Sequence, residues 1–557
     1  MKKDVIKIFA LGGLDENGKN MYILEINDDI FVFDAGIKYP ERQLRGIDII
    51  IPDANYLIIN KDRVKAYIIS HGHDDVMGSL PYIVKHVPAP VYCTKITELL
   101  IKDAARRFKV KCEFDFVNVE VDQDIKIAGR TFKFFPTTHS ACDSVGFAVE
   151  TSQGQIVYLT DFILDFSSPD LYRTDLRRLA NIADQGVLLL MCESANADMP
   201  GHTSPNHKLT PHIENIFEDH KGRIITALYT QNLYQIGEVI TLCKKNKKRI
   251  LFFSIEMQKL IKEFVKLGIY DIPDNMLVDY EALTKSGNDD IVVIVTGIGE
   301  KLYRVLEKMA QGDTDKNFHA LSTDQFVIAA ALVPGIEVVG AKSIDDIYRT
   351  GAKVLNVSNK KVQSMHAHEE DIKLILSLFK PKYYMPIKGE FRHLVANAKI
   401  AMSMNVGYSH NNVLVYDNGM VALFEDQQYK GIQGEVTYGE VMVDGLGVGD
   451  VGNIVITDRQ KLADDGVVVV GITIDTKAKE IVAGPDVQMR GLIFLKDAEY
   501  ILKELARIMT DELEDYFTSH RIGKIEDTKV TIRDKMVKYL RRETGKIPMV
   551  LPVVIEV

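Results

Sequence analysis

The stretch Ser70-His71-Gly72-His73-Asp74-Asp75-Val76-Met77-Gly78 decides how the rest of this chain is interpreted. It follows the apolar run Ala66-Tyr67-Ile68-Ile69, whose length and composition predict a buried β-strand. Its centre fits the pattern H-x-H-x-D, which places two imidazoles and a carboxylate on one tight turn. Imidazoles and carboxylates are common protein ligands of transition-metal ions. The sequence therefore predicts a metal site at the end of this strand.

Similar polar residues follow four other predicted strands. The strands over residues 30–33, 131–135, 155–159 and 187–191 lead into Asp34, His139, Asp161 and Glu193. Ligands usually bind in crevices beyond strand ends. We therefore expect these residues and the H-x-H-x-D turn to line an active site along one edge of a sheet.

The size and composition of the chain limit the possible classes of protein. The chain has 557 residues, too many for one hydrophobic core, and about three domains are expected. Its net charge of −10 argues against non-specific coating of nucleic acid, although a local basic channel is still compatible. No long apolar run and no leader segment are found, so we expect no membrane association. The five cysteines are scattered and odd in number, which is typical of a reducing cytoplasm.

The pattern of predicted elements divides the chain into five parts. Residues 1–205 form a first domain of short strands and helices, and residues 206–351 alternate helices with strands as a second α/β unit. Residues 352–444 return to strands that end in polar residues, so the first domain is expected to resume there. The segment 445–465 is rich in Gly and Asp and predicts a linker, and residues 466–557 predict a small α+β domain.

The histidines and aspartates at these strand ends can form two adjacent metal sites. A dinuclear hydrolase holds two cations that share a carboxylate. His71, His73 and His139 can supply the nitrogens of a first site, with Asp161 as the shared carboxylate, and Asp75 would begin a second site. The alternative is that all of them are ordinary polar residues at loop starts. The compact H-x-H-x-D turn after a strand favours the metal.

Two further acidic residues are expected to support these ligands. Asp34 and Glu193 follow buried strands and can orient a ligand histidine through hydrogen bonds.

The order of these motifs resembles the metallo-β-lactamase superfamily, and the whole chain resembles the ribonuclease J family within it. This resemblance implies an α/β fold: an αββα sandwich interrupted by a β-CASP domain over residues 206–351 and followed by a small α+β C-terminal domain. The stretches that carry it are Ala10-Leu11-Gly12-Gly13-Leu14, Gly18-Lys19-Asn20, Phe33-Asp34-Ala35-Gly36, His71-Gly72-His73, Thr138-His139-Ser140, Asp161-Phe162 and Lys380-Pro381-Lys382.

The resemblance also implies an activity. It implies a metal-dependent ribonuclease, with Zn²⁺ or Mn²⁺, that degrades 5′-monophosphorylated single-stranded RNA from the 5′ end and makes some internal cuts. It implies work in the cytoplasm on rRNA maturation and mRNA decay. Asp75, Asp161 and His366 would be catalytic. The implied substrate-binding residues are Val362, Gln363, Ser364, Met365, His366 and Lys388.

Several positions depart from the family pattern. The longer motif H-x-H-x-D-H has a second metal histidine where this chain has Val76, and the late motif Pro-Val-His-Gly-Glu has another where it has Lys388. The loop Ser-Gly-His contains Met365 in place of glycine, and a β-CASP histidine corresponds to Tyr234. Such departures most resemble the type-2 paralogues of the family. They predict one good metal site and a second that is weak or absent.

Lys388 suggests what replaces the second metal ion. We hypothesise that its ammonium points toward Asp75 and Asp161 and takes the place of the missing cation, because a lysine can neutralise carboxylates but cannot activate water as a metal does. The alternative is that Lys388 reaches solvent.

Two functions are compatible with this site. The chain is a weak ribonuclease that forms homodimers and hetero-oligomers and acts with an active type-1 ribonuclease J paralogue. Alternatively, it is an inactive pseudo-nuclease that binds RNA and stabilises or tunes that paralogue. Measured turnover on RNA would separate the two.

Overall fold

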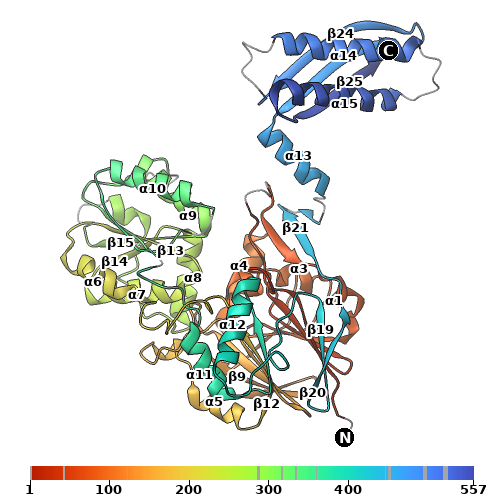
Figure 1. Cartoon of the computed structure of the whole chain (residues 1–557). Helices are drawn as coiled ribbons and strands as arrows, with labels where there is room; N and C mark the ends of the chain where they lie inside the picture. Colours follow the sequence, from red (N-terminus) through yellow and green to blue (C-terminus); the bar gives the residue numbers. More distant parts are fainter. Residues whose placement is uncertain are drawn as a thin grey trace. The chain divides into compact units, whose positions relative to one another are not determined.

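Two β-sheets that pack face to face form the core of the larger part of the molecule (Figure 1). The structure is a computed structural model that describes residues 3–41, 44, 46–121, 123–284, 289–314, 318–332, 335–358, 360–445, 447–449, 453–492, 499–518 and 525–557. These residues fall into two units. The larger unit comprises Met1–Tyr39 and Ile49–Val441, and the smaller unit comprises Pro40–Asp48 and Met442–Val557.

The first sheet of the larger unit has eight strands in the order β20-β19-β1-β2-β3-β5-β6-β7. Strand β3 shows how the sheet is buried on both faces. Its side chains Phe31 and Phe33 face the second sheet, whereas Ile30 and Val32 face the covering helices. The strands are β1 (Ile6–Gly12), β2 (Met21–Ile26), β3 (Asp29–Phe33), β5 (Val64–Ile68), β6 (Val91–Cys93), β7 (Phe116–Asn118), β19 (Met420–Glu425) and β20 (Gln428–Glu435).

The second sheet has six strands in the order β18-β12-β11-β10-β9-β8. Aromatic side chains from both sheets meet between them, and the ring of Phe33 lies 4.8 Å from that of Phe147 and 5.4 Å from that of Tyr158. The strands are β8 (Asp124–Ile127), β9 (Arg130–Pro136), β10 (Val145–Thr151), β11 (Gly154–Leu159), β12 (Val187–Glu193) and β18 (Tyr383–Ile387).

Helices cover the outer face of each sheet. The first sheet packs against α3 (Leu80–Val84) and α4 (Lys95–Arg107). The second packs against α5 (Leu176–Ala183), α11 (Glu369–Phe379) and α12 (Phe391–Ser403). The predicted αββα sandwich is confirmed.

A third, parallel sheet interrupts the sandwich and forms the inserted subdomain, defined as residues 206–358. Its strand order is β14-β15-β13-β16-β17, and helices alternate with its strands. The predicted boundary at residue 351 falls too early, because β17 pairs in parallel with β16 instead of joining the sandwich. The elements are α6 (Thr210–Asp219), β13 (Ile224–Tyr229), α7 (Leu233–Lys245), β14 (Arg249–Phe252), α8 (Ile255–Lys266), β15 (Ile291–Gly297), α9 (Gly299–Gln311), β16 (Gln325–Ile328), α10 (Glu337–Arg349) and β17 (Lys353–Asn356).

The smaller unit contains a three-stranded sheet in the order β24-β23-β25, covered on one face by two helices. Every second residue of β23, from Val468 to Ile474, is buried against those helices. The elements are β23 (Val467–Asp475), β24 (Glu480–Arg490), α14 (Glu499–Thr518), α15 (Ile525–Thr544) and β25 (Met549–Glu556). Strand β24 was not expected from the sequence, since Gly484 and Pro485 interrupt its apolar pattern.

The segment predicted to be a linker contains a helix. Residues Asn453–Asp464 form α13, and the glycines that suggested a linker lie on either side of it. Residues 446 and 450–452 of this segment lie outside the described residues. In the part of the chain that the structure describes, no helix combines the length and the hydropathy needed to cross a membrane.

Candidate metal centre

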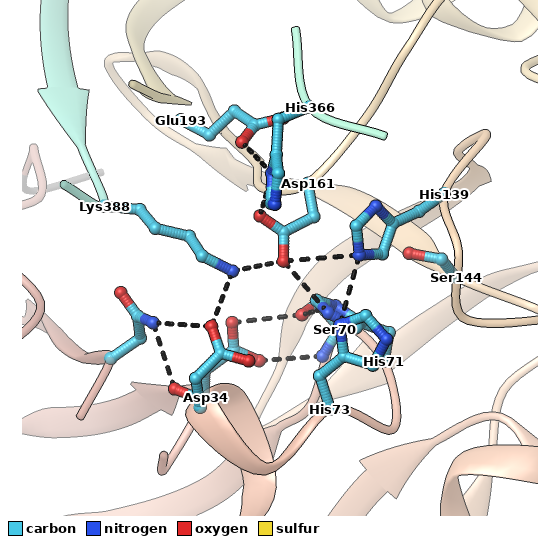
Figure 2. A network of polar contacts seen from close by, with 12 residues as sticks. Asp34, Ser70, His71, His73, His139, Ser144, Asp161, Glu193, His366 and Lys388 are labelled. Atoms are coloured by element: carbon cyan, nitrogen blue, oxygen red, sulfur yellow. Dashed lines mark hydrogen bonds and ion pairs between the residues drawn. The ribbon is translucent and has the colours of Figure 1, made fainter. Parts of the chain in front are cut away.

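The predicted site residues come together at the ends of strands from both sheets (Figure 2). Asp34 and the H-x-H-x-D turn follow β3 and β5 of the first sheet, whereas His139 and Asp161 follow β9 and β11 of the second. The expectation that one sheet carries them all was therefore wrong. The edges of two facing sheets meet at the site, which allows ligands to approach from opposite sides.

Four ligand atoms converge on one point of this edge. The Nε2 atom of His71 lies 3.0 Å from Oδ2 of Asp161, and Nε2 of His139 lies 3.7 Å from the same oxygen. The Nδ1 atom of His73 lies 3.2 Å from Nε2 of His139. All four ligand atoms lie within 4.8 Å of one another, which is the spacing that a single cation needs. We call these residues the cage.

Hydrogen bonds on the outer side of the His73 and His139 rings determine which ring nitrogens carry no proton. The backbone oxygen of Gln231 lies 3.2 Å from Nε2 of His73, and that of Met365 lies 2.8 Å from Nδ1 of His139. A carbonyl oxygen can only accept, so each of these ring nitrogens carries the proton of a neutral imidazole. The two nitrogens that face each other inside the cage, Nδ1 of His73 and Nε2 of His139, therefore each carry a lone pair and no proton.

The third histidine is assigned in the same way. The Ser70 hydroxyl donates to Oδ2 of Asp34 at 3.0 Å, so its oxygen accepts from Nδ1 of His71, also at 3.0 Å. Nε2 of His71 then presents a lone pair, and it has no hydrogen-bond partner among the described residues. Asp34 thus supports His71 through Ser70 and not by direct contact.

Burial disfavours the doubly protonated, charged form of two of the cage histidines. It lowers the pKa of His73 to about 3 and that of His139 well below its ordinary value. Three converging lone pairs and the Asp161 carboxylate form an electron-rich cluster with no hydrogen between its nitrogens. These residues fit one divalent cation.

Lys388 occupies the other side of Asp161. Its Nζ lies 2.9 Å from Oδ2 of Asp75 and also contacts Oδ2 of Asp161, and its side chain is only 7% exposed. The structure thus places the ammonium between the two carboxylates and not in solvent. Although burial raises the pKa of Asp161, Lys388 holds it well below the ordinary value. Although burial lowers the pKa of Lys388, Asp161 and Asp75 raise it above its ordinary range.

Asn20 supports the second carboxylate, a role that the sequence did not reveal. Its side-chain amide donates to the backbone oxygen of Asp75 at 3.0 Å and to Oδ2 of the same residue at 3.2 Å. The only signal in the sequence was the position of Asn20 in the stretch Gly18-Lys19-Asn20.

Gly36 allows the turn that carries Asp75 to pack against the end of β3. A Cβ atom at this position would lie 1.6 Å from the backbone oxygen of Asp75. We expect Gly36→Ala to lower the free energy of unfolding by about 3 kcal/mol or more, since the clash is with backbone and not with a flexible side chain. Gly439→Ala is the matched control, because its Cβ would meet nothing closer than 3.7 Å. Urea unfolding of both variants measures this, and equal stabilities would contradict the packing argument.

The residue between His73 and Asp75 anchors the turn from outside. Asp74 is 2% exposed, and its carboxylate accepts from Nη2 of Arg107 at 2.6 Å and from the Tyr39 hydroxyl at 2.7 Å. This network joins α4 to the metal turn.

Loss of that anchor should weaken the fold. We expect Arg107→Ala to lower the free energy of unfolding by about 2 kcal/mol, because it leaves the buried Asp74 carboxylate without its cation. The value is reduced from that of a fully buried pair because Arg107 is 33% exposed. The control is Arg106→Ala, at a neighbouring residue that is 57% exposed. This change should lower the free energy of unfolding by about 0.5 kcal/mol or less. An equal loss in both variants would show that Asp74 is not an anchor.

His366 lies on the remaining side of Asp161. Its Nδ1 lies 2.7 Å from Oε2 of Glu193 and 3.4 Å from Oδ1 of Asp161. Burial alone lowers the pKa of His366, but the two carboxylates outweigh it and raise the pKa to about 10. Glu193 also accepts from the backbone amides of Phe162 and Ala367, so it holds the backbone that follows Asp161 as well as the backbone that follows His366.

The predicted substrate loop is only partly available to a ligand. Ser364 is exposed, and its hydroxyl accepts from the Asn196 amide at 3.0 Å. The side chains of Val362 and Met365 are instead 6% and 4% exposed and pack in an apolar cluster. Only their backbone can serve a substrate. Gln363 is fastened by a backbone hydrogen bond to Asn206 at 2.9 Å.

A cavity of about 120 Å³ opens beside these groups. It is lined by His73, Asp75, Asp161, His366 and Lys388, and by the residues that lead into α12. His366, the ammonium of Lys388 and two cage residues, His73 and Asp161, therefore face one space that is large enough for a phosphate group.

Comparison with known proteins identifies the family. Models of the metallo-beta-lactamase superfamily, the ribonuclease J beta-CASP domain and the ribonuclease J C-terminal domain match residues 14–204, 221–347 and 454–557. A protein named Ribonuclease J 2 from Staphylococcus epidermidis is 33% identical over 557 residues, which cover 100% of this chain and 99% of that protein. The chain belongs to the ribonuclease J family. A protein named Ribonuclease J 2 from Staphylococcus aureus is 32% identical over the same shares of the two chains.

Membership of the ribonuclease J family agrees with the observed domains and with the predicted resemblance. A solved structure, described as a protein of unknown function from Enterococcus faecalis V583, has a similar fold. The TM-score is 0.53 at 14% identity, and the match covers 75% of this chain and 100% of that chain. The metallo-β-lactamase fold of the ribonuclease J family implies binding of divalent metal, and the cage supplies ligands for it.

Proposed function

We propose that this chain is a metal-dependent ribonuclease with weak activity of its own, which acts on RNA together with an active type-1 ribonuclease J paralogue. The observation that carries the proposal is the contrast between the two halves of the site. The cage has its full set of ligands, whereas Lys388 fills the position of a second cation between Asp75 and Asp161.

One divalent cation would be held by the nitrogens of His71, His73 and His139 and by Asp161. Such a cation supplies a Lewis acid that lowers the pKa of bound water. A set of ligands dominated by nitrogen favours Zn²⁺, and Mn²⁺ is the second candidate because it accepts mixed nitrogen and oxygen ligands. Lys388 neutralises the remaining carboxylates but has no vacant position for a water ligand, so the expected activity is low.

The cavity supports a phosphate-containing substrate. Lys388 and His366, whose raised pKa keeps its ring charged, both line this cavity, and Ser364 precedes His366 by two residues. These groups suit single-stranded RNA with a 5′-monophosphate, which we propose is degraded from that end with occasional internal cuts. Asp75, Asp161 and His366 are the proposed catalytic residues. The processes served would be rRNA maturation and mRNA turnover.

A weaker candidate for RNA contacts is the basic run at the end of α7, which comprises Lys244, Lys245, Lys247, Lys248 and Arg249. Lys244 pairs with Asp271, and Lys245 pairs with Glu214 at 2.6 Å and Glu218 at 2.9 Å. These ion pairs neutralise much of its charge. The substrate is therefore assigned to the cavity and not to this run.

The proposed assembly is a homodimer that also forms hetero-oligomers with the type-1 paralogue. We place it in the cytoplasm, because all five cysteines are free and four of them are buried as apolar groups.

The second candidate function is an inactive pseudo-nuclease that binds RNA and stabilises the paralogue. The ammonium of Lys388 in the second cation position favours it.

Degradation of a 5′-monophosphorylated RNA by the purified chain, with Zn²⁺ or Mn²⁺, tests the proposal. The comparison is with His71→Ala/His73→Ala, and His86→Ala/His410→Ala serves as a matched control because both of these histidines are exposed. Slow turnover that is lost only in the cage variant supports the weak enzyme. Equal, negligible rates in all three proteins refute it, and retained RNA binding would then favour the pseudo-nuclease.

A further inference from the structure

Two of the three cage histidines are held by backbone that lies outside the strands of the sandwich. Gln231, whose oxygen faces His73, lies in the inserted subdomain between β13 and α7. Met365, whose oxygen faces His139, lies in the segment that follows the subdomain, and its side chain packs in the apolar cluster that contains the subdomain residues Leu233 and Tyr234. The ring of His71 instead bonds to Ser70 at the end of β5. The cage is thus assembled from two structural parts.

A third backbone contact joins the same parts. The amide of Tyr234 donates to the oxygen of Ser140 at 3.0 Å, one residue beyond His139. We call the contacts of Gln231, Tyr234 and Met365 with the residues of the sandwich the seat of the subdomain.

Apolar packing fixes the seat in place. The ring of Tyr234 meets that of Tyr172 edge to face at 5.1 Å. Met365 is 4% exposed and belongs to the same apolar cluster as both tyrosines. The carbonyl oxygens are therefore presented by packed segments, so their positions depend on how the subdomain lies against the sandwich.

We infer that Gln231 and Met365 are positioning residues for the metal cage, and that metal binding is coupled to seating of the inserted subdomain. This inference rests on the proposed metal site. If the subdomain leaves its seat, His73 and His139 lose the acceptors that keep their inner nitrogens as lone pairs. Because linkage is reciprocal, a cation that binds the seated form more tightly must also stabilise the seat.

Hydrogen exchange of the full chain provides the first test. Zn²⁺ should slow exchange of the peptide that contains the Tyr234 amide, because that amide donates across the seat. His71→Ala should remove this protection, since it deletes a ligand while leaving every contact of the seat in place. Protection confined to the strand ends that carry the ligands would contradict the coupling.

Substitution at Met365 provides the second test. Met365→Ala removes the side chain that fastens the carbonyl, and we expect zinc affinity, measured by competition with a chelator, to fall about 10-fold. Met365→Leu keeps the packing and should restore it. Met257→Ala is the matched control, because Met257 is 3% exposed in the same cluster but presents no carbonyl to a histidine. A merely structural role would lower stability in both alanine variants without changing zinc affinity.

The outcomes separate this inference from the proposed function. Zinc binding of equal affinity in all Met365 variants, without protection at Tyr234, overturns the coupling and leaves the metal site standing. Failure of the wild-type chain to bind Zn²⁺ overturns both.

Discussion

Replacing Lys388 by methionine will lower the free energy of unfolding of the metal-free protein by about 3 kcal/mol. Removal of one partner from a buried ion pair leaves uncompensated charge, here on Asp75 and Asp161. We take the lower end of the usual range because the Asp75 side chain is 31% exposed. Mn²⁺ should then recover most of the loss, since a cation can enter the position that the ammonium leaves. Urea unfolding in a chelator and in Mn²⁺ measures both effects.

Lys19→Met is the matched control for this prediction. Lys19 is 2% exposed, and its Nζ lies 3.0 Å from Oε1 of Glu16, so it is also a buried ion pair. Its loss should destabilise the fold to a similar degree, but Mn²⁺ should raise its stability no more than it raises that of the wild type. If Lys388→Met matched the wild type in chelator, or gained no more from Mn²⁺ than Lys19→Met does, Lys388 would not be the substitute for a cation.

Restoring both missing histidines will convert the chain to a two-metal protein. The variant Val76→His/Lys388→His should bind two divalent ions where the wild type binds one. It should also degrade RNA about 10²-fold faster, which corresponds to an activation free energy lower by about 2.7 kcal/mol. The reason is that a second cation stabilises developing charge that an ammonium cannot match. Native mass spectrometry gives the metal stoichiometry, and single-turnover rates give the acceleration.

The single variant Val76→His tests the logic of this design. It adds a ligand but leaves the ammonium of Lys388 between Asp75 and Asp161. We therefore expect one bound ion and no acceleration. Two ions in the single variant, or one in the double variant, would show that Lys388 does not block the second site.

Much of the fold could be predicted because its signals are local. The strands that end before Asp34, His71 and Asp161 and the strand that ends at Glu193 were all predicted, since short apolar runs that stop at polar residues indicate buried strands. The position of β17 was not, because Val354 and Leu355 would suit either sheet and only pairing with β16 assigns them. The helix α13 was missed because nearby glycines outweighed the residues between them.

The residues of the candidate site were likewise predicted only in part. The histidines and aspartates of the cage stood out by residue type, whereas Ser70 and Asn20 carry no metal-binding signature. Gln231 was not predicted, and Met365 was predicted only as a substrate-binding residue, because both face the cage histidines through backbone oxygens that every residue has. Side-chain identity says nothing about which carbonyl a histidine will meet.

By itself the sequence determined which chemical groups this protein has for its reaction: three histidines, a shared aspartate, and a valine and a lysine where two more histidines would complete a second site. Only the tertiary structure decided what these groups do to one another. It places the Lys388 ammonium against Asp75 and Asp161, and it sets each imidazole's proton on the side away from the cage. Both outcomes depend on contacts between segments far apart in the chain, and such contacts arise from packing and not from local pattern.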